Sequence, residues 1–214
     1  LARGTRLAVI GDFAREPRFQ GAGSSLINPS RLDTVLGELG AFTSSFAFAP
    51  GYDQGDGRRR PDLIAQAVAA ARDAEVALVF AGLTRDYEAE GLDRTDLGLP
   101  DSHVALIEAV GAANPRTVVV LSNGSAVEMP WLGLVPAVLE AWLPGQAGAG
   151  AVLDLVFGLA SPSGKLAESF PVSLSDLPSS RHFPEGPVTV EYREGLYVGY
   201  RWFDSSGTRP LFCF

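Results

Sequence analysis

Cysteine and histidine are scarce in this 214-residue chain, which contains one Cys and two His. Because Cys213 has no partner within the chain, an internal disulfide is excluded and no oxidising compartment is required. His103 and His182 are far apart in the sequence, so we expect no zinc site. A serine hydrolase is also disfavoured, because the segment 123–127 (Asn-Gly-Ser-Ala-Val) lacks the final glycine of a nucleophile elbow.

Basic residues and long apolar runs are also in short supply. The chain has 17 Lys and Arg against 25 Asp and Glu, for a formal net charge of -8. Apart from residues 58–60 the basic residues are scattered, so we expect no nucleic-acid-binding surface. Apolar runs such as 76–81 and 118–121 are much shorter than the roughly 20 residues of a membrane helix. The composition therefore predicts a soluble globular protein and leaves its compartment open.

Both ends of the chain are apolar. It begins at Leu1, almost directly on a strand-like segment, and it ends on residues 211–214 (Leu-Phe-Cys-Phe). Apolar ends usually continue into further chain or pack against it. We therefore expect these residues to be a fragment or a processed piece of a longer protein.

Continuous apolar segments alternate with segments of helical character. Such runs are typical of strands in a parallel sheet that is covered on both faces. The expected strands are residues 7–10, 46–49, 76–81, 117–121 and 137–142, and the expected helices are residues 32–39, 62–73, 102–112 and 147–157. This order predicts an α/β fold, a three-layer α/β/α sandwich around a mostly parallel sheet of about six strands.

Local signals mark the ends of three helices. Asn28 or Ser30 is the predicted cap of the first helix, and Pro100 with Asp101 supplies a turn and a cap for the third. Gly158 is the predicted end of the fourth.

The pattern changes from about residue 161. Prolines at 162, 171, 178, 184 and 187 exclude long helices, and residues 188–201 are rich in aromatic and β-branched side chains. We expect one domain over residues 1–214, with a core over 5–160. An irregular proline-rich tail over 161–214 is expected to wrap this core and to contain one or two strands.

Polar segments follow the expected strands, at the sheet edge where open α/β sheets bind ligands. The richest is the acidic segment, residues 85–96, which holds five carboxylates, two arginines and a tyrosine. A carboxylate beside arginine has a lowered pKa, whereas one enclosed by apolar groups has a raised pKa, so this segment can hold two acids with different roles. A solvated acidic loop is the alternative.

A glycine loop, residues 21–26 (Gly-Ala-Gly-Ser-Ser-Leu), comes after the first strand. It is a poor dinucleotide-binding motif, because Leu26 replaces the third glycine and the loop starts about ten residues too late. It can bring backbone and hydroxyl groups to a polar ligand, or it is a plain surface turn. Asn123-Gly124-Ser125 matches a glycosylation sequon, which as a single match is weak.

Taken in order, these segments resemble the C-terminal domain of family 3 glycoside hydrolases, the β-glucosidase group. The resemblance covers nearly the whole chain and rests on residues 9–11, 21–25, 88–94, 97–100, 118–124, 130–131, 144–148, 162–166, 170–171, 192–201 and 210–212. It implies that an N-terminal (β/α)8 barrel, absent from these residues, supplies the aspartate nucleophile, and that this domain supplies the general acid/base.

The resemblance also implies roles for single residues. The E-G-x-D-R pattern places the acid/base on Glu90, with Glu88 as second choice. Ser24 and Ser25 resemble the loop that touches the bound sugar. Tyr87 and Trp202 are candidates for contacts with the aglycone, although packing is the more ordinary role of such aromatic side chains.

The implied partners are a β-glucoside, the barrel domain and, in a homo-oligomer, a second copy of the chain. No metal or cofactor is implied. In a retaining glycosidase the two carboxyl groups stand about 5 to 5.5 Å apart, so the chain without its barrel is expected to be inactive. Two alternatives stay open: a non-catalytic carbohydrate-binding or scaffold module of the same fold, and a nucleotide-binding α/β domain, which the glycine loop disfavours.

Overall fold

The computed structural model describes residues 1–183 and 188–214, which form two compact units. The first unit comprises Leu1–Leu92, Leu99–Gly124 and Pro130–Pro162, and the second comprises Asp93–Gly98, Ser125–Met129 and Ser163–Phe214. Two prolines of the predicted tail, Pro184 and Pro187, lie outside the described residues.

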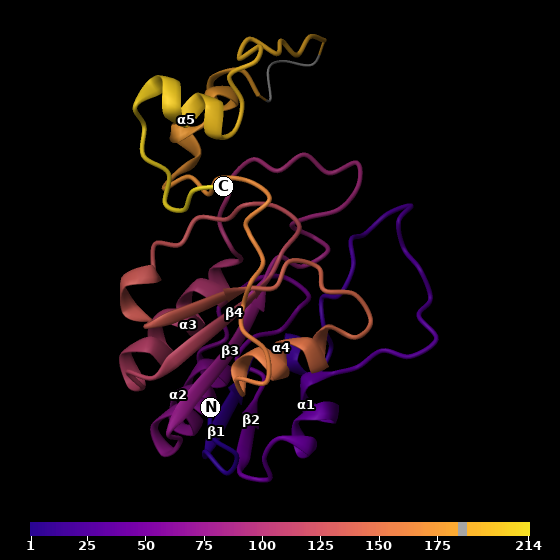
Figure 1. Cartoon of the computed structure of the whole chain (residues 1–214), viewed down its shortest axis with the longest axis vertical. Helices are drawn as coiled ribbons and strands as arrows, with labels where there is room; N and C mark the ends of the chain where they lie inside the picture. The colour runs from indigo at the N-terminus through magenta and orange to yellow at the C-terminus, as the bar shows by residue number, and fades with distance from the viewer. Residues whose placement is uncertain (184–187) are drawn as a thin grey trace. The chain divides into compact units, whose positions relative to one another are not determined.

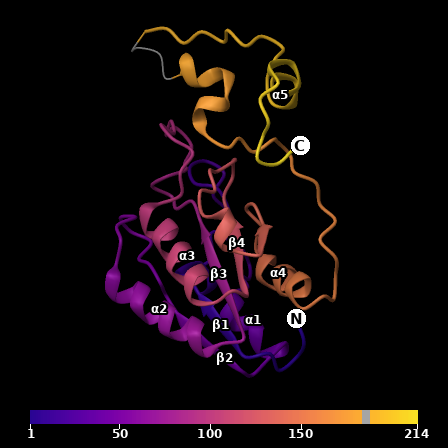
Figure 2. The same cartoon turned by 90° about the vertical axis from the view of Figure 1, so that its left-hand side faces the viewer.

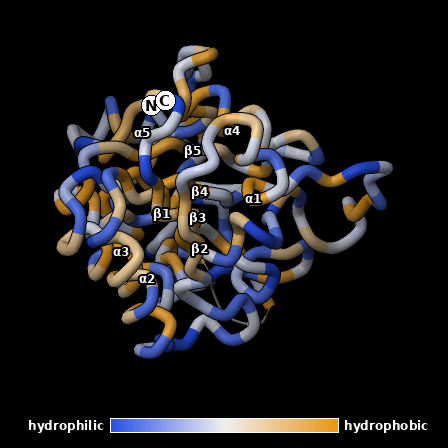
Figure 3. Tube along the Cα trace, turned by 90° about the horizontal axis from the view of Figure 1, so that it is seen from below, coloured by the Kyte–Doolittle hydropathy of each residue, from blue (hydrophilic) through white to orange (hydrophobic). Residues whose placement is uncertain are grey.

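A parallel sheet of five strands forms the centre of the first unit, in the order β2-β1-β3-β4-β5. The strands are β1 (Leu7–Ile10), β2 (Phe46–Ala49), β3 (Val76–Gly82), β4 (Thr117–Ser122) and β5 (Ala137–Glu140). Every residue of β1 and β3 is buried, as expected for strands that are covered on both faces. Figure 3 shows hydrophobic residues along these central strands, between the helices.

The sheet confirms the predicted α/β fold. Strands β1 and β2 have the predicted bounds, whereas the described residues form five strands rather than about six. The last strand is shorter than predicted, because Trp142 has a φ of 53° and so leaves the extended conformation. The backbone N–H of Ala141 still donates to Leu121 O at 2.9 Å, and the ladder ends there.

Helices cover both faces of the sheet. They are α1 (Val35–Glu38), α2 (Pro61–Asp73), α3 (Asp101–Ala113) and α4 (Gly148–Val156). Helices α2 and α3 lie along one face, and α1 and α4 lie along the other (Figures 1 and 2). The predicted helices are therefore all present, with α1 much shorter than expected.

Two of the predicted caps are wrong. Helix α1 starts at Val35, and its cap is Thr34, whose side chain accepts a hydrogen bond from Gly37 N at 3.0 Å, so neither Asn28 nor Ser30 caps it. Asp101 lies in the first turn of α3 and not at the cap, and its carboxylate pairs with Arg59 at 2.6 Å. Gly158 follows α4 with a φ of 72°, as its predicted role requires.

The direction in which strands are added to the sheet reverses between β1 and β3. The chain adds β2 on one side of β1 and then adds β3 on the other side, which creates a topological switch point. Glycines end both strands there. A Cβ on Gly11 would lie 2.1 Å from Phe80 O, and one on Gly82 would lie 1.9 Å from Ser122 O. Only glycine allows these backbones to approach so closely.

The second unit has little regular structure. It contains the short helix α5 (Tyr200–Ser206), two 3-10 turns (Leu174–Asp176 and Pro178–Arg181) and an antiparallel bridge between Phe170 and Phe212. Of the one or two strands expected in the tail over residues 161–214, the described residues form only this bridge, and no strand forms over 188–201. Gly195 and Gly199 interrupt the extended chain there with φ values of 57° and 54°. None of the described helices is both long and apolar enough to span a membrane.

Candidate active site

The acidic segment divides between the two units. Residues 85–92 belong to the first unit, where they are part of the loop that follows β3, and residues 93–96 belong to the second. A tight turn starts the loop, because the backbone N–H groups of Tyr87 and Glu88 both donate to Thr84 O at 3.1 Å. This turn places Glu88 and Glu90 beyond the carboxyl end of the sheet.

Glu88 is half-buried and fixed by backbone groups. Its carboxylate accepts a hydrogen bond from Gly124 N at 2.8 Å, directly after β4. A Cβ on Gly124 would lie 3.1 Å from this carboxyl group, so the glycine makes the close approach possible. The backbone carbonyl of Glu88 accepts a second hydrogen bond, from Nη2 of the buried Arg18 at 2.9 Å.

Glu90 is exposed and contacts the glycine loop. Its carboxylate accepts hydrogen bonds from the hydroxyl of Ser24 and from Ser24 N, the latter at 2.6 Å, while Glu90 N donates to Ala22 O at 3.1 Å. Gly23 has a φ of 101°, and a Cβ there would lie 2.5 Å from Glu90 Cβ. The glycine loop thus packs directly on the candidate acid/base, a contact that needs both its glycine and its serine.

The two hydrogen bonds set the charge state of Glu90. The Ser24 hydroxyl, followed by the Ser24 backbone N–H, lowers the pKa of the Glu90 carboxyl below its usual value. A carboxyl group with a lowered pKa is ionised at neutral pH and suits a base or a hydrogen-bond acceptor. A role as an acid therefore requires further groups that raise the pKa of Glu90.

The other predicted binding residues take different positions. Ser25 is exposed, and within the described residues no hydrogen bond joins it to Glu88 or Glu90. The Tyr87 hydroxyl packs against Gly57, where a Cβ would lie only 2.3 Å away, so Tyr87 holds the loop in place. Trp202 belongs to the second unit, where its Nε1 donates to Asp176 O at 2.7 Å.

Sequence reasoning missed a polar cluster at the ends of β4 and β5. Asn123 is fully buried, and its Nδ2 donates to Glu140 Oε2 at 3.2 Å. Glu140 Oε1 accepts from Trp142 N at 2.8 Å, which holds the Trp142 backbone in its left-handed conformation. The sequence did contain a signal for this cluster, because Glu140 is a charged residue at the end of an apolar strand. Because Asn123 is buried, the sequon is closed to modification in the folded chain.

A buried aromatic cluster underlies the site. The rings of Tyr52 and His103 lie 3.8 Å apart, and Phe13 meets both edge-on. The Tyr52 hydroxyl donates to Phe80 O and accepts from Phe13 N, both at 3.0 Å, while His103 Nδ1 accepts from Gly82 N at 3.2 Å. Burial lowers the pKa of His103 to about 3, so this imidazole is neutral at physiological pH and supports the strand ends.

The described residues offer no metal centre, since nowhere do three His, Cys, Asp or Glu side chains gather closely enough to hold an ion. The chemistry available at this edge of the sheet is therefore that of two carboxylates on one loop, Glu88 and Glu90, backed by a serine hydroxyl and by backbone N–H groups.

Comparison with protein families gives one match over most of the chain. Residues 1–200 match the glycosyl hydrolase family 3 C-terminal domain. The chain is 48% identical over 217 residues to thermostable beta-glucosidase B of Acetivibrio thermocellus, covering 100% of this chain and 29% of that protein. It is 44% identical over 203 residues to an exo-alpha-(1->6)-L-arabinopyranosidase of Bifidobacterium longum, covering 94% of this chain and 27% of that protein. It thus spans less than a third of these relatives.

Solved structures agree with these matches. The GH3 beta-glucosidase of Bifidobacterium adolescentis superposes with a TM-score of 0.92 at 44% identity, over 98% of this chain and 31% of that one. A beta-glucosidase from Streptomyces venezuelae in complex with D-glucose superposes with a TM-score of 0.88 at 28% identity, over 99% of this chain and 40% of that one.

Proposed function

Because the chain belongs to the glycosyl hydrolase family 3 C-terminal domain family, we propose that it is part of a retaining β-glucosidase-like exo-glycosidase. In this proposal it supplies the general acid/base for hydrolysis of terminal non-reducing β-D-glucosyl residues. The observation that carries the proposal is the pair of carboxylates on one loop at the carboxyl end of the sheet. Their bonds to the glycine loop and to the end of β4 fix where each stands.

We assign the acid/base role to Glu90 rather than to Glu88. Glu90 is exposed, so its carboxylate can reach a glycosidic oxygen and afterwards a water molecule. The carboxylate of Glu88 is half-buried and bonded to the backbone of β4, which suits a residue that positions the loop. Glu88 is the alternative acid/base.

The chemistry needs a partner carboxylate from outside these residues. That nucleophile would attack the anomeric carbon while Glu90 gives its proton to the departing oxygen. Glu90 would then take a proton from the water that releases the sugar. A negative nucleophile close by raises the pKa of an acid, opposing the lowering effect of Ser24. The barrel domain is thus proposed both to supply the nucleophile and to set the charge state of Glu90.

The test uses a longer protein that contains this chain together with its barrel. Wild type, Glu90→Ala and Glu88→Ala are compared on an aryl β-glucoside, with and without azide. An activated aryl leaving group needs little acid help, so loss of the acid/base slows breakdown of the glycosyl-enzyme, and azide restores turnover by attacking it. Glu108→Ala, which removes an exposed glutamate from α3, is the control and keeps wild-type activity.

If azide restores the activity of Glu90→Ala but not of Glu88→Ala, the acid/base role of Glu90 is supported. If azide restores only the activity of Glu88→Ala, Glu88 is the acid/base. An aryl α-L-arabinopyranoside belongs in the same assay, because one relative is named for that activity. A wild-type protein that hydrolyses no aryl glycoside contradicts the catalytic proposal.

A second candidate function is carbohydrate binding without catalysis. It is favoured by the lowered pKa of Glu90, because an ionised carboxylate accepts hydrogen bonds from sugar hydroxyl groups. Two results together would establish this function instead: titration calorimetry shows that glucose binds to the 214-residue chain, and the longer protein hydrolyses no aryl glycoside.

A further inference from the structure

A cavity of about 500 Å³ opens at the carboxyl ends of the first three strands. Its walls come from residues 15–20 after β1, residues 54–55 after β2 and residues 84–86 after β3, with Leu32 and Thr34 from the segment before α1. It therefore lies beside the switch point between β1 and β3, where open α/β sheets bind ligands. All of its lining residues belong to the first unit.

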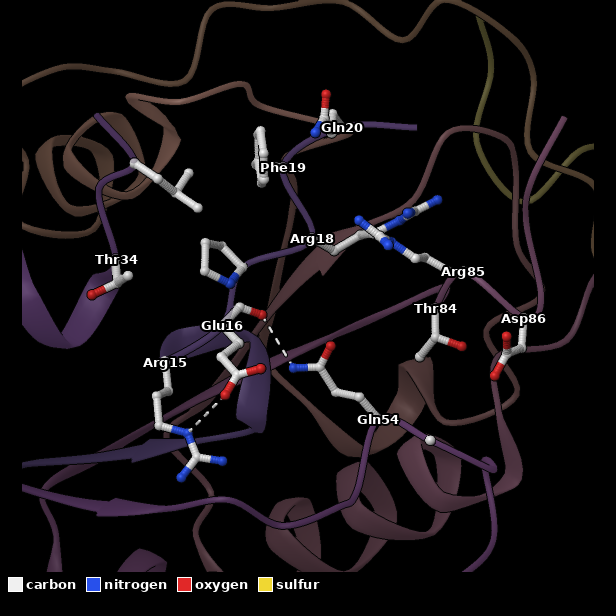
Figure 4. A pocket seen from close by; sticks show the side chains of 13 residues that line it. Arg15, Glu16, Arg18, Phe19, Gln20, Thr34, Gln54, Thr84, Arg85 and Asp86 are labelled. Carbon is white, nitrogen blue, oxygen red and sulfur yellow. Dashed lines mark hydrogen bonds and ion pairs between the residues drawn. The ribbon is translucent and has the colours of Figure 1, made fainter. Parts of the chain in front are cut away.

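Two arginines line the same part of this cavity. Figure 4 shows the side chains of Arg18 and Arg85 converging from two different loops. Burial lowers the pKa of Arg18, the carboxylate of Glu88 raises it, and the positive charge of Arg85 lowers it again. The two guanidinium groups are thus close enough to repel one another.

Neither guanidinium group is bonded to a carboxylate within the described residues. Arg18 is only 7% exposed, and its one hydrogen bond there runs from Nη2 to the backbone carbonyl of Glu88. Its Nε is buried and has no partner in the part of the chain that the structure describes. Arg85 is exposed and makes neither a hydrogen bond nor an ion pair with any described residue. A buried donor without an acceptor is costly, and two neighbouring positive charges add repulsion.

The remaining charges around the cavity are paired differently. Arg15 is bonded to Asp12 at 2.6 Å, and its Nε lies 3.9 Å from Glu16. Gln54 donates to Asp12 at 2.8 Å and to the backbone carbonyl of Glu16 at 3.2 Å, as Figure 4 shows for the latter. Asp86 also lines the cavity. Asp12 therefore offsets the charge of Arg15, and the carboxylate of Glu88 offsets part of the charge of Arg18. Neither carboxylate bonds to Arg18 or Arg85, so both guanidinium groups can still donate hydrogen bonds to a ligand.

We propose that this cavity binds a small organic anion, with its carboxylate or phosphate group between Arg18 and Arg85. Guanidinium groups bind both oxyanions through paired, charge-assisted hydrogen bonds. The side chains of Pro17, Phe19 and Leu32 supply apolar wall for the rest of the ligand, and Thr84 adds a hydroxyl group. The proposal does not rest on the assignment of Glu90, whose carboxylate bonds to Ser24 and to neither arginine.

Titration calorimetry on the 214-residue chain tests the proposal with four probes: benzoate, phenyl phosphate, inorganic phosphate and benzyl alcohol. Saturable binding of benzoate and phenyl phosphate, at least about tenfold tighter than that of neutral benzyl alcohol and weakened by added salt, supports it. The ratio between benzoate and phenyl phosphate tells which oxyanion the pair prefers. Inorganic phosphate that binds as tightly as phenyl phosphate overturns the organic part of the proposal.

Single substitutions locate the site. Arg85→Gln removes an exposed side chain, so the fold persists, and we expect anion binding to weaken about tenfold. Arg18→Gln is expected to weaken it at least as much, with circular dichroism reporting whether the chain still folds. Arg72→Gln removes the same charge from the exposed face of α2 and serves as the matched control. Equal binding by Arg85→Gln and Arg72→Gln, or no saturable binding by wild type, overturns the proposal.

Discussion

Ser24 donates two hydrogen bonds to the carboxylate of Glu90, one from its backbone N–H at 2.6 Å and one from its hydroxyl group. The two residues are 66 positions apart in the chain. Their contact joins the glycine loop to the loop after β3 and fixes the carboxylate of Glu90 at the edge of the sheet. The charge and position of Glu90 are therefore shared properties of the two loops.

Replacing Ser24 by alanine is expected to raise the pKa of Glu90. The hydroxyl is the larger of the two lowering effects, and the backbone N–H of residue 24 remains, so the pKa returns only part of the way to its usual value. Titration of the side-chain carboxyl carbon by NMR measures the change. Ser25→Ala, in the same exposed loop, is the control and leaves the pKa of Glu90 unchanged; an equal shift in both variants contradicts the assignment.

Gly23→Ala is expected to destabilise the chain more than Gly4→Ala does. Both glycines have positive φ, 101° and 88°, so alanine is strained at either position. Only Gly23 also faces an obstacle, because its Cβ would lie 2.5 Å from Glu90 Cβ, whereas nothing lies within 4 Å at Gly4. We expect an additional loss of about 1 kcal/mol in unfolding free energy by urea denaturation. Equal losses would show that the Gly23–Glu90 contact is not made in solution.

His103 is expected to make the chain less stable in acid. Its pKa is about 3 in the folded chain, against an ordinary value of 6.5, because burial disfavours the charged imidazolium. Between these two values the unfolded chain binds more protons, so this contribution to stability is complete above pH 6.5 and is lost as the pH falls toward 3. The slope is at most about 1.4 kcal/mol per pH unit.

The measurement is the unfolding free energy by urea denaturation between pH 7 and pH 4. His103→Gln is expected to flatten its dependence on pH, even though the variant is less stable throughout. Asn28→Ala, which changes an exposed side chain that does not titrate, keeps the wild-type slope. A wild-type slope in His103→Gln contradicts the prediction.

Asn114→Ala is expected to cost about 2 to 3 kcal/mol of unfolding free energy. The side chain is buried, and its Nδ2 donates to Ala71 O at 2.8 Å and to Ala74 O at 3.1 Å, while its Oδ1 accepts from Arg116 N at 2.8 Å. Alanine leaves the two carbonyl groups at the end of α2 and the N–H group directly before β4 without this partner. Asn28→Ala is the control, because Asn28 is exposed and does not cap α1, and its effect stays within about 0.5 kcal/mol. Similar losses for both variants would contradict the role of Asn114.

The alternation of apolar and helical segments was enough to predict the sheet. Strand β1 matched to the residue, because a strand that is buried on both faces has a continuous apolar sequence with sharp ends. Strand β2 also matched to the residue, although it is an edge strand whose first two residues are exposed. The one or two strands expected in the tail over residues 161–214 did not form beyond the Phe170–Phe212 bridge. Aromatic and β-branched residues favour extended chain only where a neighbouring strand pairs with it, and the positive φ of Gly195 and Gly199 interrupts the chain.

By itself the sequence determined the fold class, the strands and the segment that carries the candidate acid/base, because hydrophobic periodicity and local composition are properties of neighbouring residues. Only the tertiary structure decided which groups meet. It paired Ser24 with Glu90, set Glu88 on the end of β4, and brought Arg18 and Arg85 to one cavity. These contacts join segments that are far apart in the chain, and the pKa of a carboxyl group or the charge of a cavity depends on such neighbours in space.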